Sequence, residues 1–143
     1  MSAPVIMALL VLGPLCWLLG GYRWKWVRKY VWAGIAGICV WLSSISLLTA
    51  LGVALAVGVT SSLPYGDRTP GFLRPLVFAS YGLPAVAIAP SVASAVLFPL
   101  VSGGLLIALF MASRRWNFIT FKLWEGAAGF IQASTLVIAC LIR

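Results

Sequence analysis

Long stretches without any charged residue constrain this sequence more than any other feature. Only 8% of its 143 residues are charged, whereas 63% are hydrophobic, and the charges lie in short clusters between the apolar stretches. A water-soluble domain keeps its surface hydrated with charge on about a quarter of its positions. The pattern therefore predicts an all-α integral membrane protein in which lipid surrounds most side chains.

The apolar stretches are long enough to predict a bundle of four transmembrane helices in a single domain, residues 1–143. A helix of about 20 apolar residues crosses the hydrocarbon layer of a bilayer. The predicted spans cover about residues 3–20, 31–60, 91–112 and 118–142. The second span is the longest, and as one continuous helix it must tilt. A proline-broken segment at about 76–89 is expected to be re-entrant or interfacial, or to form a short fifth crossing.

The basic residues favour four crossings over five. Four crossings place seven basic residues on one face of the membrane and three on the other, whereas five crossings divide them evenly. The positive-inside rule then puts both termini outside the cytoplasm. A bacterial inner membrane is expected, and a mitochondrial inner membrane is compatible with the sequence. The expected interfacial anchors are Arg23, Trp24, Lys25, Trp26, Arg114, Arg115 and Trp116.

The composition also limits the chemistry and the partners. The formal net charge is +8, and the cations lie at predicted membrane boundaries, so anionic lipid headgroups are expected as partners rather than nucleic acid. The chain has no histidine, and its three cysteines lie in apolar stretches without CxxC spacing. We therefore expect no metal site, no cofactor and no disulfide. An enzyme is not expected, because a histidine-based catalytic set cannot be assembled.

Small residues recur every four positions in three of the predicted helices. Such stripes let helix backbones approach closely, which drives association in lipid. The sequence leaves open whether they pack within one chain or between chains of a homo-oligomer or larger membrane complex. The expected helix-packing residues are Ala50, Ala54, Gly58, Gly104, Ala108, Gly129 and Ala133.

Several polar residues lie inside apolar stretches. Ser43, Ser46 and Thr49 have helical spacing. They either bond to carbonyl groups of the preceding turn or to a neighbouring helix, or they line a pore or solute path. Glu125 either pairs with Lys122 one turn away at the surface or forms a proton or cation site.

The last predicted span carries two further polar residues, Gln132 and Ser134. An amide or hydroxyl inside an apolar helix is usually satisfied by a neighbouring helix. Both are therefore expected to be interhelical hydrogen-bond partners.

Three short stretches resemble segments of small polytopic membrane proteins encoded by phages and prophages. They are Gly21 to Trp26, Leu63 to Gly66 and Phe121 to Glu125. The resemblance implies a holin-like or other phage membrane function. It identifies no catalytic or binding residue, and the chain differs from common holins in lacking a strongly charged C-terminal tail.

Three functions agree with these features. The first is a non-enzymatic structural or accessory subunit that packs through its Gly/Ala helix faces. The alternative is an oligomeric pore or holin-like channel lined by Ser43, Ser46 and Thr49. A second alternative is a small-solute transporter that uses Glu125 and the broken segment near Pro84 and Pro90.

Overall fold

Helices are the regular elements throughout the part of the chain that the structure describes, which confirms the predicted all-helical fold. The computed structural model describes residues 1–20, 24–43, 45–63, 71–116 and 121–143, with backbone alone for 113–116 and 121–124. The elements are α1 (Ala3–Leu19), the π-helix η1 (Val27–Val31), α2 (Trp32–Leu42), α3 (Leu47–Ser62), α4 (Arg74–Ser80), α5 (Leu83–Val86), α6 (Val92–Trp116) and α7 (Phe121–Ile142).

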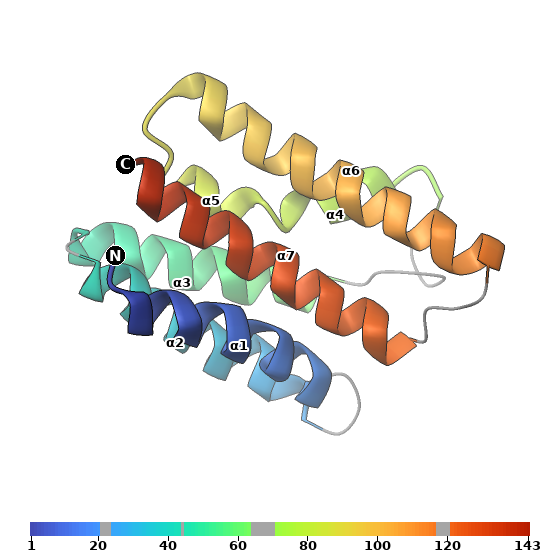
Figure 1. The fold of residues 1–143 in the computed structure, drawn as a ribbon, viewed down its shortest axis with the longest axis horizontal. Helices are drawn as coiled ribbons and strands as arrows, with labels where there is room; N and C mark the ends of the chain where they lie inside the picture. The colour runs from blue at the N-terminus through green and yellow to red at the C-terminus, as the bar shows by residue number, and fades with distance from the viewer. Residues whose placement is uncertain (21–23, 44, 64–70, 117–120) are drawn as a thin grey trace.

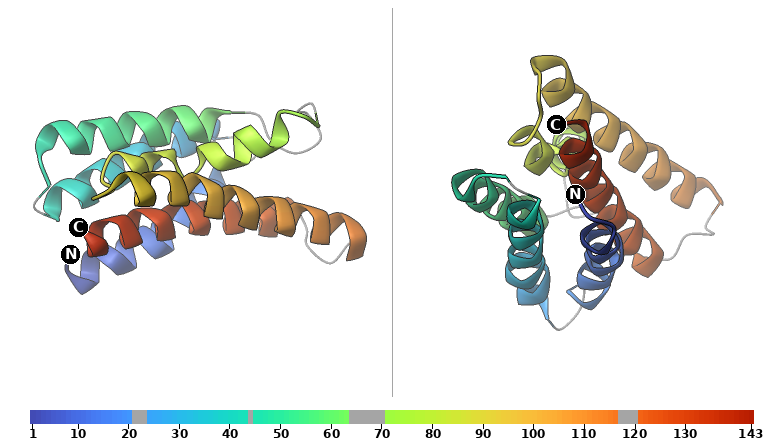
Figure 2. Two further views of the ribbon diagram at one scale, coloured as in Figure 1. Left: turned by 90° about the horizontal axis from the view of Figure 1, so that it is seen from above. Right: turned by 60° about the vertical axis from the view of Figure 1, so that its left-hand side comes forward.

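The chain runs back and forth along one axis (Figure 1). Both termini lie at one end, which we call the terminal end. α1, α3 and α6 run away from it, whereas η1–α2, α4–α5 and α7 run back toward it (Figure 2). The first and last helices are antiparallel neighbours, because Gly13 lies against Ala133 and Gly129 lies against Trp17.

The expectation of one continuous helix over about 31–60 is wrong. α2 ends at Leu42 and α3 begins at Leu47, so the two helices form an antiparallel hairpin. In this hairpin Gly37 lies against Ala54, and Gly58 lies against the Lys29 carbonyl group. Hairpin packing buries small-residue faces that a single long helix would leave without a partner in the chain.

Hydroxyl side chains explain where the hairpin turns. Ser43 Oγ donates to the Cys39 carbonyl oxygen at 2.8 Å, and Ser43 is the C-cap of α2. Ser46 is the N-cap of α3, where its Oγ accepts from the Thr49 backbone N–H at 3.2 Å. Such bonds compete with the helical ladder and satisfy the unpaired groups at a helix end.

The expected broken segment at about 76–89 corresponds to α4 and α5. Pro75 and Pro84 each lie in the first turn of their helix, where a missing N–H does no harm. Gly82 separates the two helices and touches α6, because a Cβ there would lie 2.6 Å from the Phe98 carbonyl oxygen. α4 and α5 therefore lie antiparallel along α6 as a further pass (Figure 1).

Two helices in the described part are long and apolar enough to cross a membrane. They are Val92–Ala112 within α6 and Glu125–Ile142 within α7. α1 and α3 are also apolar, but they are shorter. The passes outnumber the four expected spans because the second span divides into a hairpin and the broken segment runs lengthwise.

Basic residues gather at the end opposite the termini, which we call the basic end. η1 and the residues before it bring Lys25, Arg28 and Lys29 there, and α4 begins there with Arg74. Four crossings put Arg74 among the three basic residues on the face opposite to Lys25, but the extra pass made by α3 brings it to the same end. Its guanidinium lies 5.1 Å from the centre of the Phe110 ring, near the same end of α6.

Candidate functional site

Polar side chains meet inside the bundle near its basic end. We call this group the buried polar cluster, and it draws on α1, η1, α2, α3 and α7. Each member has less than a tenth of its surface exposed. The cluster consists of Trp17, Arg28, Trp32, Thr60, Ser61, Glu125 and Gln132.

An ion pair between Arg28 and Glu125 forms one half of the cluster. Arg28 Nη2 lies 3.0 Å from Glu125 Oε1, and the two side chains are 9% and 3% exposed. The same Nη2 donates to the Trp17 carbonyl oxygen at 2.7 Å, and the guanidinium lies 4.2 Å from the centre of the Trp17 ring. Trp17 lies in the last turn of α1, where a cation complements the helix dipole.

The π turn of η1 directs Arg28 toward the bundle. The Trp32 backbone N–H donates to the Val27 carbonyl oxygen, one residue further back than in an α-helix. The turn buries Val27 and Arg28 while Tyr30 stays exposed. π turns inside helices are frequent at functional sites.

Gln132 is the hydrogen-bond centre of the other half. Its Oε1 accepts from Trp32 Nε1 at 2.8 Å and from Trp17 Nε1 at 3.3 Å, with Ser61 Oγ at 3.5 Å. Its Nε2 donates to Thr60 Oγ1 at 3.0 Å. One fully buried amide thus joins α1, α2, α3 and α7. This confirms the expectation that Gln132 is an interhelical hydrogen-bond partner.

Ser134 behaves differently from Gln132. Its Oγ donates to the Phe130 carbonyl oxygen at 2.7 Å, within α7 itself. The expected interhelical role is therefore wrong for Ser134, because its hydroxyl reaches a carbonyl group of the preceding turn.

The expected surface position of Glu125 is wrong, and the side chain of Lys122, its expected partner, lies outside the described part of the structure. Glu125 is 2% exposed and pairs with Arg28, which lies almost a hundred positions earlier in the sequence. Local helical spacing could not reveal this contact, because it arises where the start of α7 packs on the end of α1 and on η1.

The three hydroxyl residues proposed to line a pore do not share one helix face. Ser43 ends α2, and Ser46 precedes α3. Ser46 Oγ and Thr49 Oγ1 lie 2.8 Å apart in an exposed hydrogen bond. The predicted mid-helix stripe is therefore wrong, because these side chains stabilise the hairpin turn at the terminal end.

The expected packing residues fall into two groups. Ala50, Ala54 and Gly58 contact the η1–α2 segment, and Gly129 and Ala133 contact α1, all within this chain. The two remaining residues, Gly104 and Ala108, lie exposed on α6.

The expected interfacial anchors lie at the basic end where they are described. Trp24, Lys25 and Trp26 are exposed there, just before η1. Arg114, Arg115 and Trp116 form the end of α6, although their side chains are outside the description. Arg23 is outside the described residues.

The chemistry of the cluster is that of charge neutralisation and hydrogen bonding. Among the described residues, no three His, Cys, Asp or Glu side chains gather to hold a metal ion.

Comparisons with protein-family models, curated proteins and solved structures found no match. The function is therefore argued from the geometry of this chain.

Proposed function

We propose that the protein is an integral membrane protein with its basic end in the cytoplasm and both termini outside. Long apolar side chains are exposed along the flanks of the bundle, and a monomer in water rarely carries such extended apolar surface. Basic residues at one end agree with the positive-inside rule. Examples of these exposed side chains are Leu48, Leu55, Leu76, Val92, Leu100 and Met111.

Within the membrane, we propose that the protein acts as a non-enzymatic structural or accessory subunit. The observation that carries this proposal is the outer face of α6. Only 22% of the apolar stretch of α6 is buried, against 50% for α7. Gly104 and Ala108 are exposed on it, and a Cβ at Gly104 would meet no atom within 4 Å. A small-residue face of this kind accepts a second helix at close range.

The buried polar cluster supports the same role. Its ion pair and its Gln132 amide bonds tie the first helix, the hairpin and the last helix into one unit. α6 lies outside this unit and packs on α4, α5 and α7, and its outer face stays open to a partner. The partner on α6 is a second copy of the chain or a helix of a larger membrane complex.

The test is to enlarge the α6 face. Gly104→Leu combined with Ala108→Leu is expected to abolish self-association or the co-purification of other subunits in a mild detergent. The molar mass of the purified particle measures this. Gly52→Leu is the matched control, since Gly52 is also exposed with open space around it but lies on α3. A wild-type protein that is a monodisperse monomer without partners contradicts the proposal.

Transport of a proton or small solute is a second candidate function, favoured by one observation. Glu125 is an ionisable group inside an apolar bundle, and such groups often mark transport pathways. Proteoliposomes that carry the wild-type protein should then conduct protons, and Glu125→Gln should abolish the flux. Equal flux in both preparations rules this candidate out.

A further inference from the structure

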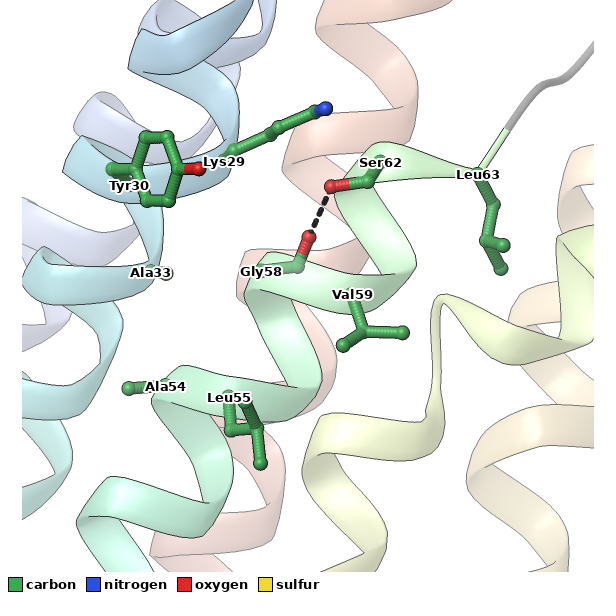
Figure 3. Close-up of a pocket in the computed structure, with 9 residues that line it drawn as sticks. All are labelled: Lys29, Tyr30, Ala33, Ala54, Leu55, Gly58, Val59, Ser62 and Leu63. Carbon is green, nitrogen blue, oxygen red and sulfur yellow. Dashed lines mark hydrogen bonds between the residues drawn. The ribbon is translucent and has the colours of Figure 1, made fainter.

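A groove opens on the outside of the bundle between the η1–α2 segment and α3 (Figure 3). Its volume is about 500 Å³. Binding sites for small molecules have volumes of about 300–1,000 Å³. The residues that line it are Lys29, Tyr30, Ala33, Ala54, Leu55, Gly58, Val59, Ser62 and Leu63.

Small residues create this groove. Ala33, Ala54 and Gly58 lie where the two segments touch, and a Cβ at Gly58 would be 3.2 Å from the Lys29 carbonyl oxygen. Because these side chains fill little space, the hollow remains between the larger Tyr30 and Leu55. The small side chains therefore explain both the close contact between the helices and the groove beside it.

The polar groups of the groove lie at one end of it. Lys29 and Ser62 lie together at that end, and Ala54 and Leu55 lie at the other (Figure 3). Ser62 Oγ donates to the Gly58 carbonyl oxygen at 2.6 Å, which keeps this hydroxyl at the rim. The polar end is also the basic end of the bundle, since Lys29 belongs to η1. Polarity thus changes along the groove as it changes across one leaflet of a bilayer.

We propose that this groove binds one anionic phospholipid. Its phosphate contacts the Lys29 ammonium group, and one acyl chain lies along Leu55 and Val59 toward Ala54. Charge complementarity selects the headgroup, because Lys29 supplies the cation of the lining and a zwitterionic lipid would bring a second cation close to it. The inference rests on the membrane residence proposed above and names one lipid site on that surface.

The experiment measures which lipids stay with the protein. The purified full-length protein is incubated with mixed micelles of phosphatidylglycerol and phosphatidylcholine, and the retained lipids are quantified by mass spectrometry. The wild type is expected to retain phosphatidylglycerol preferentially, and Lys29→Gln to lower that retention severalfold. Val59→Trp should lower it too, since it fills the groove without changing the charge.

Lys25→Gln is the matched control, because Lys25 lies one helical turn before Lys29, is exposed and does not line the groove. Unchanged retention in Lys25→Gln supports the proposal, whereas an equal loss in both lysine variants overturns it in favour of general headgroup attraction. Displacement of the lipid by inorganic phosphate alone overturns it as well.

The failure of this proposal can be told apart from that of the proposed function. A protein that stays in the membrane fraction but shows no lipid preference disproves the groove site alone. A protein that remains dissolved without detergent disproves both.

Discussion

Arg28 and Glu125 carry opposite charges inside the bundle, where the other buried polar side chains are uncharged. Removing two charges from water is unfavourable, and their attraction offsets this only when the geometry is good and further hydrogen bonds are made. Arg28 meets this condition through the Trp17 carbonyl group and the Trp17 ring. The pair therefore links η1 and the end of α1 to the start of α7 at the basic end.

Removing one partner of this pair should lower the free energy of unfolding more than replacing both partners. Glu125→Ala leaves a buried guanidinium without its carboxylate, and we expect a loss of about 3–5 kcal/mol in the free energy of unfolding. The double variant Arg28→Met with Glu125→Leu should recover most of that loss, because apolar side chains of similar volume replace the pair. Unfolding in detergent, followed by tryptophan fluorescence, measures both values. A loss below about 1 kcal/mol in Glu125→Ala would mean that the pair is solvated.

The sequence identified part of this cluster. Glu125 and Gln132 were singled out because polar side chains are rare in these apolar stretches. Arg28 lies in the basic cluster that the sequence predicts at a membrane boundary, since composition cannot distinguish an inward cation from an outward one. Trp17 and Thr60 were missed, because an indole or hydroxyl group in an apolar helix is common and its partners come from tertiary packing.

The α2–α3 hairpin depends on close contact between two helices. A Cβ at Gly37 would lie 2.9 Å from Ala54 Cβ and 3.3 Å from the Ala50 carbonyl oxygen. Gly34 is one turn earlier on the same helix, and a Cβ there would meet nothing within 4 Å. The two glycines therefore form a matched pair for separating packing from helix propensity.

Gly37→Ala should destabilise the protein and Gly34→Ala should not. The first substitution forces the hairpin apart, and overpacking of this kind costs about 1–3 kcal/mol. The second replaces an exposed helical glycine and should stabilise the helix by about 0.5–1 kcal/mol. Thermal unfolding in detergent should thus shift in opposite directions for the two variants. Equal shifts would show that α2 and α3 do not pack as described.

The helical class and the packing role of Ala50, Ala54 and Gly58 could be predicted from the sequence, whereas the hairpin could not. Apolar periodicity does not distinguish one long helix from two shorter ones that fold back. Helical spacing of Ser43, Ser46 and Thr49 is compatible with a stripe within one helix, whereas their capping bonds depend on the backbone turn that they stabilise. The one indication of a hairpin in the sequence is the length of the predicted span 31–60, which exceeds the roughly 20 residues needed to cross a bilayer.

Across the bundle as a whole, the basic side chains that the structure describes are separated by end. Lys25, Arg28, Lys29 and Arg74 lie at the basic end, whereas Arg143 follows α7 at the terminal end. The predicted spans imply a weaker separation, because they place two passes before Arg74 where the structure has three. The described basic side chains thus gather more strongly at one end than the four predicted spans imply, in agreement with the proposed orientation.

Single-cysteine labelling tests this arrangement across a sealed membrane. In a background with Cys16, Cys39 and Cys140 replaced by alanine, Ser46→Cys should react from the same side as Arg143→Cys. Lys25→Cys should react from the opposite side. Under a continuous helix over 31–60, Ser46→Cys would lie within the lipid and resist membrane-impermeant reagents. That resistance, or reaction of Ser46→Cys and Lys25→Cys from one side, would contradict the hairpin.

The π turn of η1 gives the gene for this chain a place where one codon can be lost locally. A π turn holds one residue more than an α turn, so loss of a single codon between positions 29 and 31 would leave a continuous α-helix. The α turn covers nearly the same rotation with one residue fewer, so the residues before η1 would keep their orientation relative to α2. The effect of such a deletion would therefore fall on the residues inside the turn, Arg28 among them, and not on the rest of the helix.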